Sequence, residues 1–288
     1  MVSKMEKIKC IKDKNGNKKY VFKLKDEYLI EAAVFLHNEE VHLCIPSQVG
    51  CMMKCRHCAT TYVNPSFFRQ LEYIEMVEMI DCLLLECEFN NQLYTLSFSG
   101  HGEPMCNWQC IVNVIKRYKN IFDVIDVTSI GIKMTMKQIL DGEVTPKFFF
   151  SIHGSNNESR RWIVNPFNNG TVASIEEITD FCKHYVIQKG GTCTWNYMVC
   201  QENMTLDTIS ELITLLNAID FPLELRFTKY VNIYKDNGIH EIADSEFDKM
   251  FIQISENLKS NIIVRRSQLE GIETEIACGQ MRARIIAR

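Results

Sequence analysis

The sequence predicts an α/β fold in which parallel strands alternate with helices, preceded by a small antiparallel sheet. The 288 residues are enough for one large α/β domain with a short extension. Past residue 60, strand-like segments alternate with apolar stretches of helical period. Distinctive motifs follow the strand-like segments, which is typical of parallel sheets, whose functional residues gather at the C-terminal strand ends.

The N-terminal part is expected to form the antiparallel sheet. The polar segment KNGNKK at residues 14–19 is typical of a turn. After it come three segments rich in β-branched and aromatic residues that alternate with polar ones, as in strands. We therefore expect a basic β extension over residues 1–43 and the main α/β domain over residues 44–288. The strands expected in this part are residues 20–24, 28–36 and 41–45.

The rest of the chain is expected to alternate strands and helices. Helical periodicity is clearest at residues 74–84 and 209–216, where apolar residues recur every three or four positions. Repeated strand–helix units predict parallel pairing with right-handed crossovers. The strands expected here are residues 93–98, 148–152, 193–199, 223–227 and 262–264.

Composition excludes several classes of protein. The chain is 46% hydrophobic and 24% charged, as in globular proteins. No apolar run approaches the roughly 20 residues of a membrane span, and the start of the chain has no apolar signal segment. Thirteen cysteines without a signal favour a reducing compartment over a disulfide framework. We therefore expect a cytoplasmic protein that does not interact with membranes.

The charge is unevenly distributed. The formal net charge is -4, yet residues 1–25 hold nine lysines against only Glu6 and Asp13. Such a basic arm could attract a polyanion such as a nucleic acid. The alternative, which is the more common one for a run of charges, is a solvated face.

Cys51, Cys55 and Cys58 follow the spacing CxxxCxxC. Three thiolates on one short loop can bind three irons of a [4Fe–4S] cluster and leave the fourth iron open to another ligand. S-adenosylmethionine (SAM) needs such an open iron if it is to be cleaved reductively to a carbon radical. The alternatives are a structural zinc site, which usually has four ligands, and three unrelated core cysteines.

Two further motifs follow expected strands. Gly100-His101-Gly102-Glu103-Pro104 comes after residues 93–98, where glycines allow close approach of a ligand and a glutamate can bind an ammonium group. Ser151-Ile152-His153 ends the strand expected at 148–152. Each motif alone is weak, because a simple turn or a structural histidine would look the same.

The C-terminal motif Ala277-Cys278-Gly279-Gln280-Met281 makes the combination specific. Together with SxVGCxxxCxxCxT at residues 47–60, with GxGEP, and with SxH followed by Asn156 and Arg160, it resembles the RlmN/Cfr family of radical SAM RNA adenine methyltransferases. The resemblance covers about residues 20–285. It implies a partial (β/α)6 radical SAM barrel behind the small N-terminal sheet.

The resemblance implies a role for each matching residue. Cys51, Cys55 and Cys58 would bind the cluster, Cys278 would carry the methyl group, and Cys44 would be the second catalytic cysteine. Glu31 matches the family's proposed proton acceptor, although an ordinary exposed strand glutamate is the alternative. The positions that match SAM contacts are Gly102, Glu103, Ser151, His153 and Asn232.

The family mechanism explains why two lone cysteines are needed. Cys278 is first methylated by one SAM, and a second SAM is cleaved to a radical that takes a hydrogen atom from the S-methyl group. The resulting radical adds to an electron-poor sp² carbon, C2 or C8 of adenine in the family, and Cys44 resolves the covalent adduct as a disulfide with Cys278. The resemblance further implies a low-potential electron donor such as flavodoxin or ferredoxin, and we expect a monomer.

Departures from the family leave the substrate open. Cys44 comes too early for the helical accessory domain that precedes the family's leader sheet. His101 replaces a usual methionine, residues 128–131 differ from the family's STSG, and residues 165–168 are one residue longer. The alternatives to adenine in RNA are adenine in a small nucleotide or natural product, a peptide carbon, and a non-catalytic RNA-binding relative, which would need neither Cys44 nor Cys278.

Overall fold

The computed structural model describes residues 5–37, 40–63, 67–87, 92–164, 170–232 and 237–267. These residues divide into two compact units. The first contains described residues up to 53 and from 59 to 128, and the second contains residues 54–58 together with described residues from 129 to 267. The domain boundary expected between residues 43 and 44 stays a prediction.

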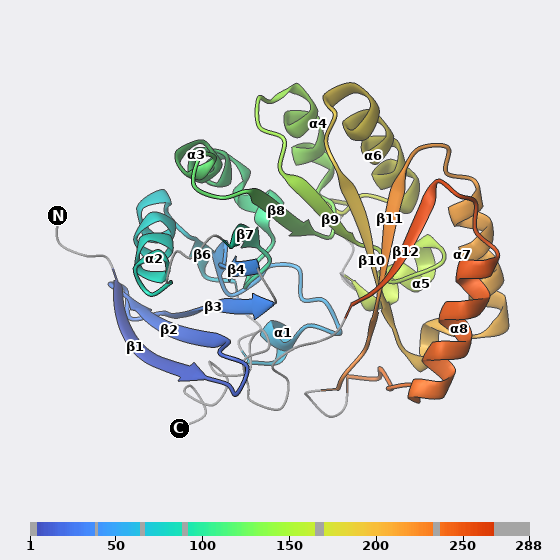
Figure 1. The fold of residues 1–288 in the computed structure, drawn as a ribbon, viewed down its shortest axis with the longest axis horizontal. Helices are drawn as coiled ribbons and strands as arrows, with labels where there is room; N and C mark the ends of the chain where they lie inside the picture. Colours follow the sequence, from blue (N-terminus) through green and yellow to red (C-terminus); the bar gives the residue numbers. More distant parts are fainter. Residues whose placement is uncertain are drawn as a thin grey trace. The chain divides into compact units, whose positions relative to one another are not determined.

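The first unit changes from antiparallel to parallel pairing along its sheet (Figure 1). Strands β1 to β4 pair as antiparallel neighbours, whereas β4, β7 and β8 run parallel. A separate short pair joins β5 and β6. The elements are β1 (Met5–Lys12), β2 (Lys18–Leu24), β3 (Leu29–His37), β4 (Glu40–Cys44), β5 (Gln48–Val49), α1 (Ala59–Val63), β6 (Arg69–Gln70), α2 (Tyr73–Leu85), β7 (Leu93–Phe98), η1 (Pro104–Asn107), α3 (Trp108–Tyr118) and β8 (Val124–Ser129).

The register of the parallel strands positions polar residues beside Cys44. Cys44 is paired with Ser97 of β7, and Ser97 is paired with Asp126 of β8. Val41 and Leu43 alternate along β4 and bury apolar side chains, whereas Cys44, Ser97 and Asp126 bring a thiol, a hydroxyl and a carboxyl into one row. The first unit therefore carries a polar row across its parallel strands, from the end of β4 to the middle of β8.

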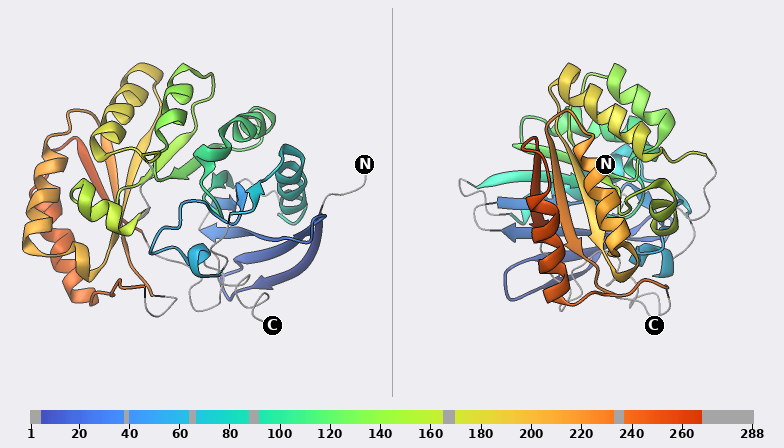
Figure 2. Two further views of the ribbon diagram at one scale, coloured as in Figure 1. Left: turned by 180° about the vertical axis from the view of Figure 1, so that it is seen from behind. Right: turned by 90° about the vertical axis from the view of Figure 1, so that its right-hand side faces the viewer.

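The second unit is a parallel βα structure. Figure 2 shows α6, α7 and α8 along one face of its strands. Phe148 and Phe150 pack against Phe181 and Tyr185 of α6, so aromatic side chains fill the core on that face. The elements are α4 (Lys133–Asp141), β9 (Lys147–Ser151), α5 (Asn157–Ile163), α6 (Ile175–Lys189), β10 (Cys193–Val199), η2 (Gln201–Asn203), α7 (Leu206–Asn217), β11 (Leu223–Lys229), α8 (Asp244–Glu256) and β12 (Ile262–Ser267). Strands β9, β10, β11 and β12 pair in parallel in that order.

Every strand expected from the sequence is present, and its ends differ by only a few residues. The segment expected as a turn is one over Lys14, Asn15 and Gly16. Four of the described strands were not expected: β1 reads as a lysine run, β8 contains Asp126 in its middle, and β5 and β6 have only two residues each. The N-terminal lysines after residue 4 therefore belong to paired strands and their turns rather than to a loose arm.

Candidate active site

Cys44 lies at the end of β4 within a chain of polar contacts. Its Sγ is 3.2 Å from Ser99 Oγ, which is 2.8 Å from Ser97 Oγ. Ser97 Oγ in turn donates a 2.5 Å hydrogen bond to Asp126 Oδ1. Because these contacts follow the strand register, the fold holds the thiol in one place at the strand ends.

The electrostatic surroundings of Cys44 are mixed. Burial raises the pKa of the Cys44 thiol, and the negative charges of Asp126 and Glu31 act in the same direction. The contact with Ser99 and the positive charge of Lys19 lower that pKa. At neutral pH the group is therefore a thiol that needs help to become a thiolate, which is the nucleophilic form.

Glu31 is not the exposed strand glutamate that was the alternative. Its side chain is only 3% exposed, and its carboxylate lies 2.9 Å from Lys19 Nζ and 3.4 Å from His101 Nε2. All three side chains are at least 97% buried. Lys19, Glu31 and His101 therefore form a buried ionisable cluster in the first unit. Such clusters are uncommon, because buried charges are rare unless they are paired.

The turn that contains His101 is fitted closely against the chain that follows Cys44. A Cβ on Gly100 would come within 2.8 Å of the backbone of Ile45, and one on Gly102 would come within 2.6 Å of Gln48. Gly102 also has a φ of +102°, a left-handed conformation that favours glycine. The two glycines therefore let the turn lie directly beside residues 45–48.

Glu103 ends this turn with a buried carboxylate. It is 3% exposed, its Oε1 accepts a 3.0 Å hydrogen bond from Met105 N, and its own N–H donates to Gln48 Oε1. A carboxylate in such a place favours a cationic partner, because an uncompensated buried charge is unfavourable. Its position suits the binding of a ligand ammonium.

The cysteine loop lies between β5 and α1. Cys51 belongs to the first unit and is half-buried, whereas Cys55 is buried and Cys58 half-buried in the second unit. Within the second unit the loop is held by Arg56, whose N–H donates to Ile163 O and whose guanidinium lies 4.5 Å from the ring centroid of Trp162. The loop thus has no regular secondary structure of its own but is anchored on α5.

The donor chemistry of this loop fits an iron–sulfur cluster. Among the described residues, no three cysteine, histidine or carboxylate side chains are grouped closely enough to hold a metal ion. The fit rests on the three thiols, which lie within eight residues of one loop. It also rests on His57 of the same loop, whose buried Nδ1 has no hydrogen-bond partner in the described part of the chain. Burial lowers the pKa of His57 to about 4, so its ring is neutral.

The second unit holds Ser151 and His153 where β9 ends. Ser151 is half-buried, and His153 is 6% exposed with a φ of +55°. Met198 N donates a 2.9 Å hydrogen bond to His153 Nδ1. Burial, together with His57 and Arg160, holds the pKa of His153 well below its usual range. His153 is therefore a neutral, fixed group.

Asn232 and Ser129 are two further residues of this unit near strand ends. Asn232, three residues beyond β11, is exposed; its N–H donates to Glu241 Oε1 and its Oδ1 accepts a hydrogen bond from Tyr230. Ser129, at the end of β8, accepts a hydrogen bond from Gly131 N. Ser129 thus stabilises the local turn where the sequence departs from the family pattern.

Cys278 and the rest of the C-terminal motif lie outside the described residues, as do residues 165–168. Within the described part, the structure reveals contributors that the sequence did not single out. Lys19 looked like one of many surface lysines, and Ser97, Ser99 and Asp126 were unremarkable strand residues. Only the strand register brings them to Glu31 and Cys44, so no local signal could have identified them.

Similar curated proteins share most of this chain. One from Fervidobacterium nodosum, described as a probable dual-specificity RNA methyltransferase RlmN, is 29% identical over 280 residues, 93% of this chain and 76% of that protein. One from Microcystis aeruginosa with the same description is 28% identical over 94% of this chain and 78% of that protein. No protein-family model matches the chain.

A solved structure shares the fold. The crystal structure of a radical SAM methyltransferase from Sphaerobacter thermophilus matches with a TM-score of 0.83 and 20% identity, over 96% of this chain and 81% of that chain. The expected α/β fold of radical SAM type is thus confirmed, and so is the resemblance to RlmN proteins. In the described helices there is no segment long and apolar enough to cross a membrane.

Proposed function

We propose that this chain, as a relative of the RlmN methyltransferases, is a radical SAM enzyme that methylates C2 or C8 of an adenine in RNA through a methylated Cys278. The supporting observation is the surroundings of Cys44. A thiol at a strand end, in polar contact with Ser99 and under the influence of Glu31, Lys19 and Asp126, suits a cysteine that must ionise during turnover.

Each reacting residue has one task in this proposal. Cys278 accepts a methyl group from SAM as a thiolate. A second SAM would supply the 5′-deoxyadenosyl radical that takes one hydrogen atom from this methyl group, and the remaining methylene group becomes joined to the substrate carbon. Glu31 accepts the proton that the substrate carbon loses, and the unpaired electron of the adduct would return to the cluster. The Cys44 thiolate then attacks the sulfur of Cys278: an S–S bond forms, the carbon–sulfur bond breaks, and the electron pair left on carbon takes up a proton to complete the methyl group. An external thiol reductant restores both cysteines.

The cofactors are a [4Fe–4S] cluster and two SAM molecules per turnover. Cys51, Cys55 and Cys58 would hold the cluster, which when bound supplies the electron that cleaves SAM. Glu103 would bind the ammonium group of SAM, since its carboxylate follows the glycine turn that matches the family's SAM-binding motif. Gly102, Ser151, His153 and Asn232 complete the proposed SAM contacts.

The buried ionisable cluster supports the choice of Glu31 as proton acceptor. The carboxylate of Glu31 lies 2.9 Å from Lys19 Nζ, and His101 offers a second group 3.4 Å away that can share a proton with it. An exposed glutamate would have no such fixed surroundings. The proposal also includes a low-potential donor such as flavodoxin or ferredoxin, a monomeric protein and a cytoplasmic location.

Methyl-labelled SAM tests the substrate directly. The reconstituted enzyme is incubated with separate pools of RNA, free adenine nucleotides and peptides, and digested products are separated by mass. We expect label on adenine carbon in RNA. The matched controls are Cys278→Ala, which should transfer no label, and Cys10→Ala, which changes an exposed cysteine of β1 and should transfer label normally.

Two results would contradict the proposal in different ways. Label found only in free nucleotides or peptides would remove RNA as the substrate while leaving the chemistry intact. Turnover by Cys278→Ala at the wild-type rate would remove the methylated cysteine.

A further inference from the structure

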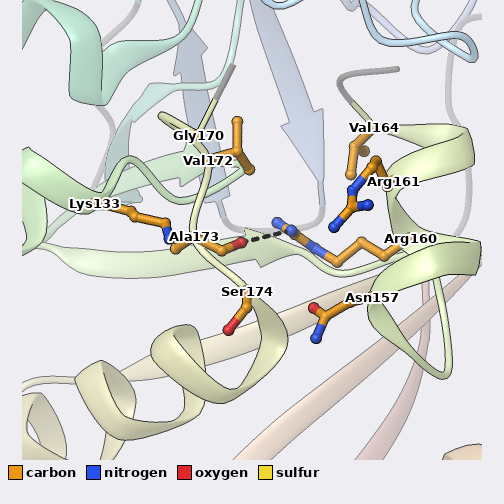
Figure 3. A pocket seen from close by; sticks show the side chains of 9 residues that line it. All are labelled: Lys133, Asn157, Arg160, Arg161, Val164, Gly170, Val172, Ala173 and Ser174. Carbon is orange, nitrogen blue, oxygen red and sulfur yellow. Dashed lines mark hydrogen bonds between the residues drawn. The ribbon is translucent and has the colours of Figure 1, made fainter. Parts of the chain in front are cut away.

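A cationic cavity lies in the second unit where β8 and β9 end. It has a volume of about 180 Å³ and is enclosed by the start of α4, by α5 and by the segment that leads into α6 (Figure 3). An isolated bridge between Ile132 and Val172 joins two of these walls. The lining residues are Lys133, Asn157, Arg160, Arg161, Val164, Gly170, Val172, Ala173 and Ser174.

Among the described residues, three cations and no carboxylate line this cavity. Arg160 is 4% exposed and forms its floor, because its Nη1 donates a 2.8 Å hydrogen bond to Ala173 O and its Nη2 donates to Ile130 O. Figure 3 shows the guanidinium groups of Arg160 and Arg161 extending from α5 toward the segment that carries Ala173. Carbonyl partners leave the full positive charge of Arg160 in place, since arginine stays protonated in proteins.

The carboxylates nearest in sequence contact two of the lining residues, Lys133 and Asn157. Glu177 Oε2 accepts from Ser174 N and its Oε1 lies 2.9 Å from Lys133, so it caps α6. Glu176 accepts a hydrogen bond from Asn157. The Lys133–Glu177 pair is half-exposed and therefore weak. The guanidinium group of Arg161 forms no hydrogen bond or ion pair with any described residue, so its charge is available to a ligand.

The cavity also lies close to a residue of this unit that is proposed to contact SAM. A Cβ on Gly154 would meet the backbone of Arg160 at 2.3 Å, so the turn after His153 packs directly on the start of the cavity floor. Arg160, the floor of the cavity, therefore lies close to His153, a residue expected to contact SAM. SAM has no phosphate group, so a cavity that binds phosphate would hold a ligand other than SAM.

We propose that this cavity binds a phosphate group of the adenine-bearing substrate, with Arg161 and Lys133 as its contacts and Arg160 as the fixed floor. Two arginines and a lysine suit a phosphate, because guanidinium groups match phosphate oxygens in a bidentate way and a lysine adds a point charge. The proposal rests on the proposed function and names how its substrate is held. The phosphate could belong to an RNA backbone or to a free nucleotide.

Binding of short RNA across a range of salt concentrations tests the cavity without catalysis. The probes are a fluorescent adenine-containing RNA oligonucleotide and an oligouridine of equal length. For Arg161→Gln we expect about tenfold weaker binding at low salt, as for loss of a charged hydrogen bond, and a salt slope smaller by about 0.7. The loss should be equal for both oligonucleotides, because phosphate contacts carry no sequence information.

Arg117→Gln is the matched control, because Arg117 is also an exposed helical arginine and the change in net charge is the same. It should bind both oligonucleotides like the wild type. A second arm compares adenosine with adenosine 5′-monophosphate as competitors. If Arg161→Gln weakens only the monophosphate, without a change for RNA, the phosphate comes from a free nucleotide.

The inference is overturned if Arg161→Gln binds RNA and the monophosphate as tightly as Arg117→Gln does. It is also overturned if the variant weakens SAM binding and leaves phosphate ligands unchanged, since the cavity would then serve the cofactor. Failure of the proposed function looks different: the wild type would bind RNA through Arg161 yet transfer no methyl group to any adenine.

Discussion

The polar strand ends of the two units differ in what their groups can do. In the first unit, Cys44 is a thiol in contact with a hydroxyl, and Glu31 forms a buried ion pair with Lys19. In the second unit, His153 is held neutral and Arg160 stays charged, and both are fixed by backbone atoms. The difference suggests a division of labour in which the first unit moves protons and thiol electrons and the second binds.

The fixed groups of the second unit are stabilised by geometry that leaves little freedom. His153 has a left-handed φ of +55° and also accepts a hydrogen bond at its carbonyl from Asn203 Nδ2. Such backbone conformations are unfavourable for residues with a side chain and persist where the surroundings enforce them. The first unit instead has sulfur and oxygen atoms in a row whose protons can rearrange.

The largest effect is expected from the loss of a proposed cluster ligand in the second unit. Cys55→Ala removes a proposed cluster ligand, so SAM cleavage to 5′-deoxyadenosine should fall to background and the brown colour of the cluster should be lost. Thermal unfolding should change by far less than the activity, since the loop has no regular secondary structure. Iron content, the visible spectrum and chromatography of the nucleoside product measure this.

Cys200→Ala is the control for Cys55→Ala, because both cysteines are buried in the second unit. It should keep the cluster. If Cys55→Ala cleaved SAM normally, the cluster assignment would be wrong, and the second unit would then be purely a binding unit.

The next largest effect separates two chemical steps within the first unit. Cys44→Ala should still methylate Cys278 and join the substrate to it, because neither step uses Cys44. Resolution needs the Cys44 sulfur, so the variant should complete one addition and stall as a covalent adduct. The mass of the Cys278 peptide from isolated protein would then include a nucleotide or an RNA fragment. Wild-type turnover without an adduct would make Cys44 an ordinary core cysteine.

The comparison also shows what a sequence alone can reveal. All eight expected strands exist, because runs such as Leu93–Phe98 combine β propensity with clear boundaries. The motif residues Cys55 and Glu103 were found because their spacing is local. Lys19 and Asp126 were missed because their role depends on pairing between strands that are distant in sequence. The strand β1 was missed because its lysines hid the alternation.

Removal of the Glu31 charge should cost stability as well as activity. Glu31→Gln leaves Lys19 buried without its counter-charge, which typically costs about 3–5 kcal/mol. The free energy of unfolding, from urea titration, measures this loss. Glu27→Gln changes an exposed carboxylate on the neighbouring turn and should change stability by less than about 1 kcal/mol.

A double variant separates stability from chemistry at Glu31. Glu31→Gln with Lys19→Met removes both buried charges and should recover much of the stability. Methyl transfer should stay low, because no proton acceptor remains. Recovery of both stability and methyl transfer would show that Glu31 serves only to compensate Lys19.

A smaller effect should appear in the pH dependence of the two units. Because burial raises the pKa of Cys44, its thiolate fraction and the rate of adduct resolution should rise with pH through the neutral range. Ser99→Ala removes a contact that lowers this pKa, so resolution should be slower at each pH. SAM binding should show no step near pH 6.5, since His153 stays neutral there. Single-turnover product release and SAM titrations from pH 6 to 9 measure both.

The smallest effect is expected from the N-terminal lysines. Lys9 and Lys12 are exposed on β1, which pairs only with β2 among the described strands. Lysines on such an edge protect it from pairing with another chain. Lys9→Gln with Lys12→Gln should therefore increase self-association, measured by light scattering, while the salt slope of RNA binding changes by less than the roughly 0.7 of one phosphate contact. A larger drop in slope would make β1 an RNA-binding surface, and binding would then belong to both units.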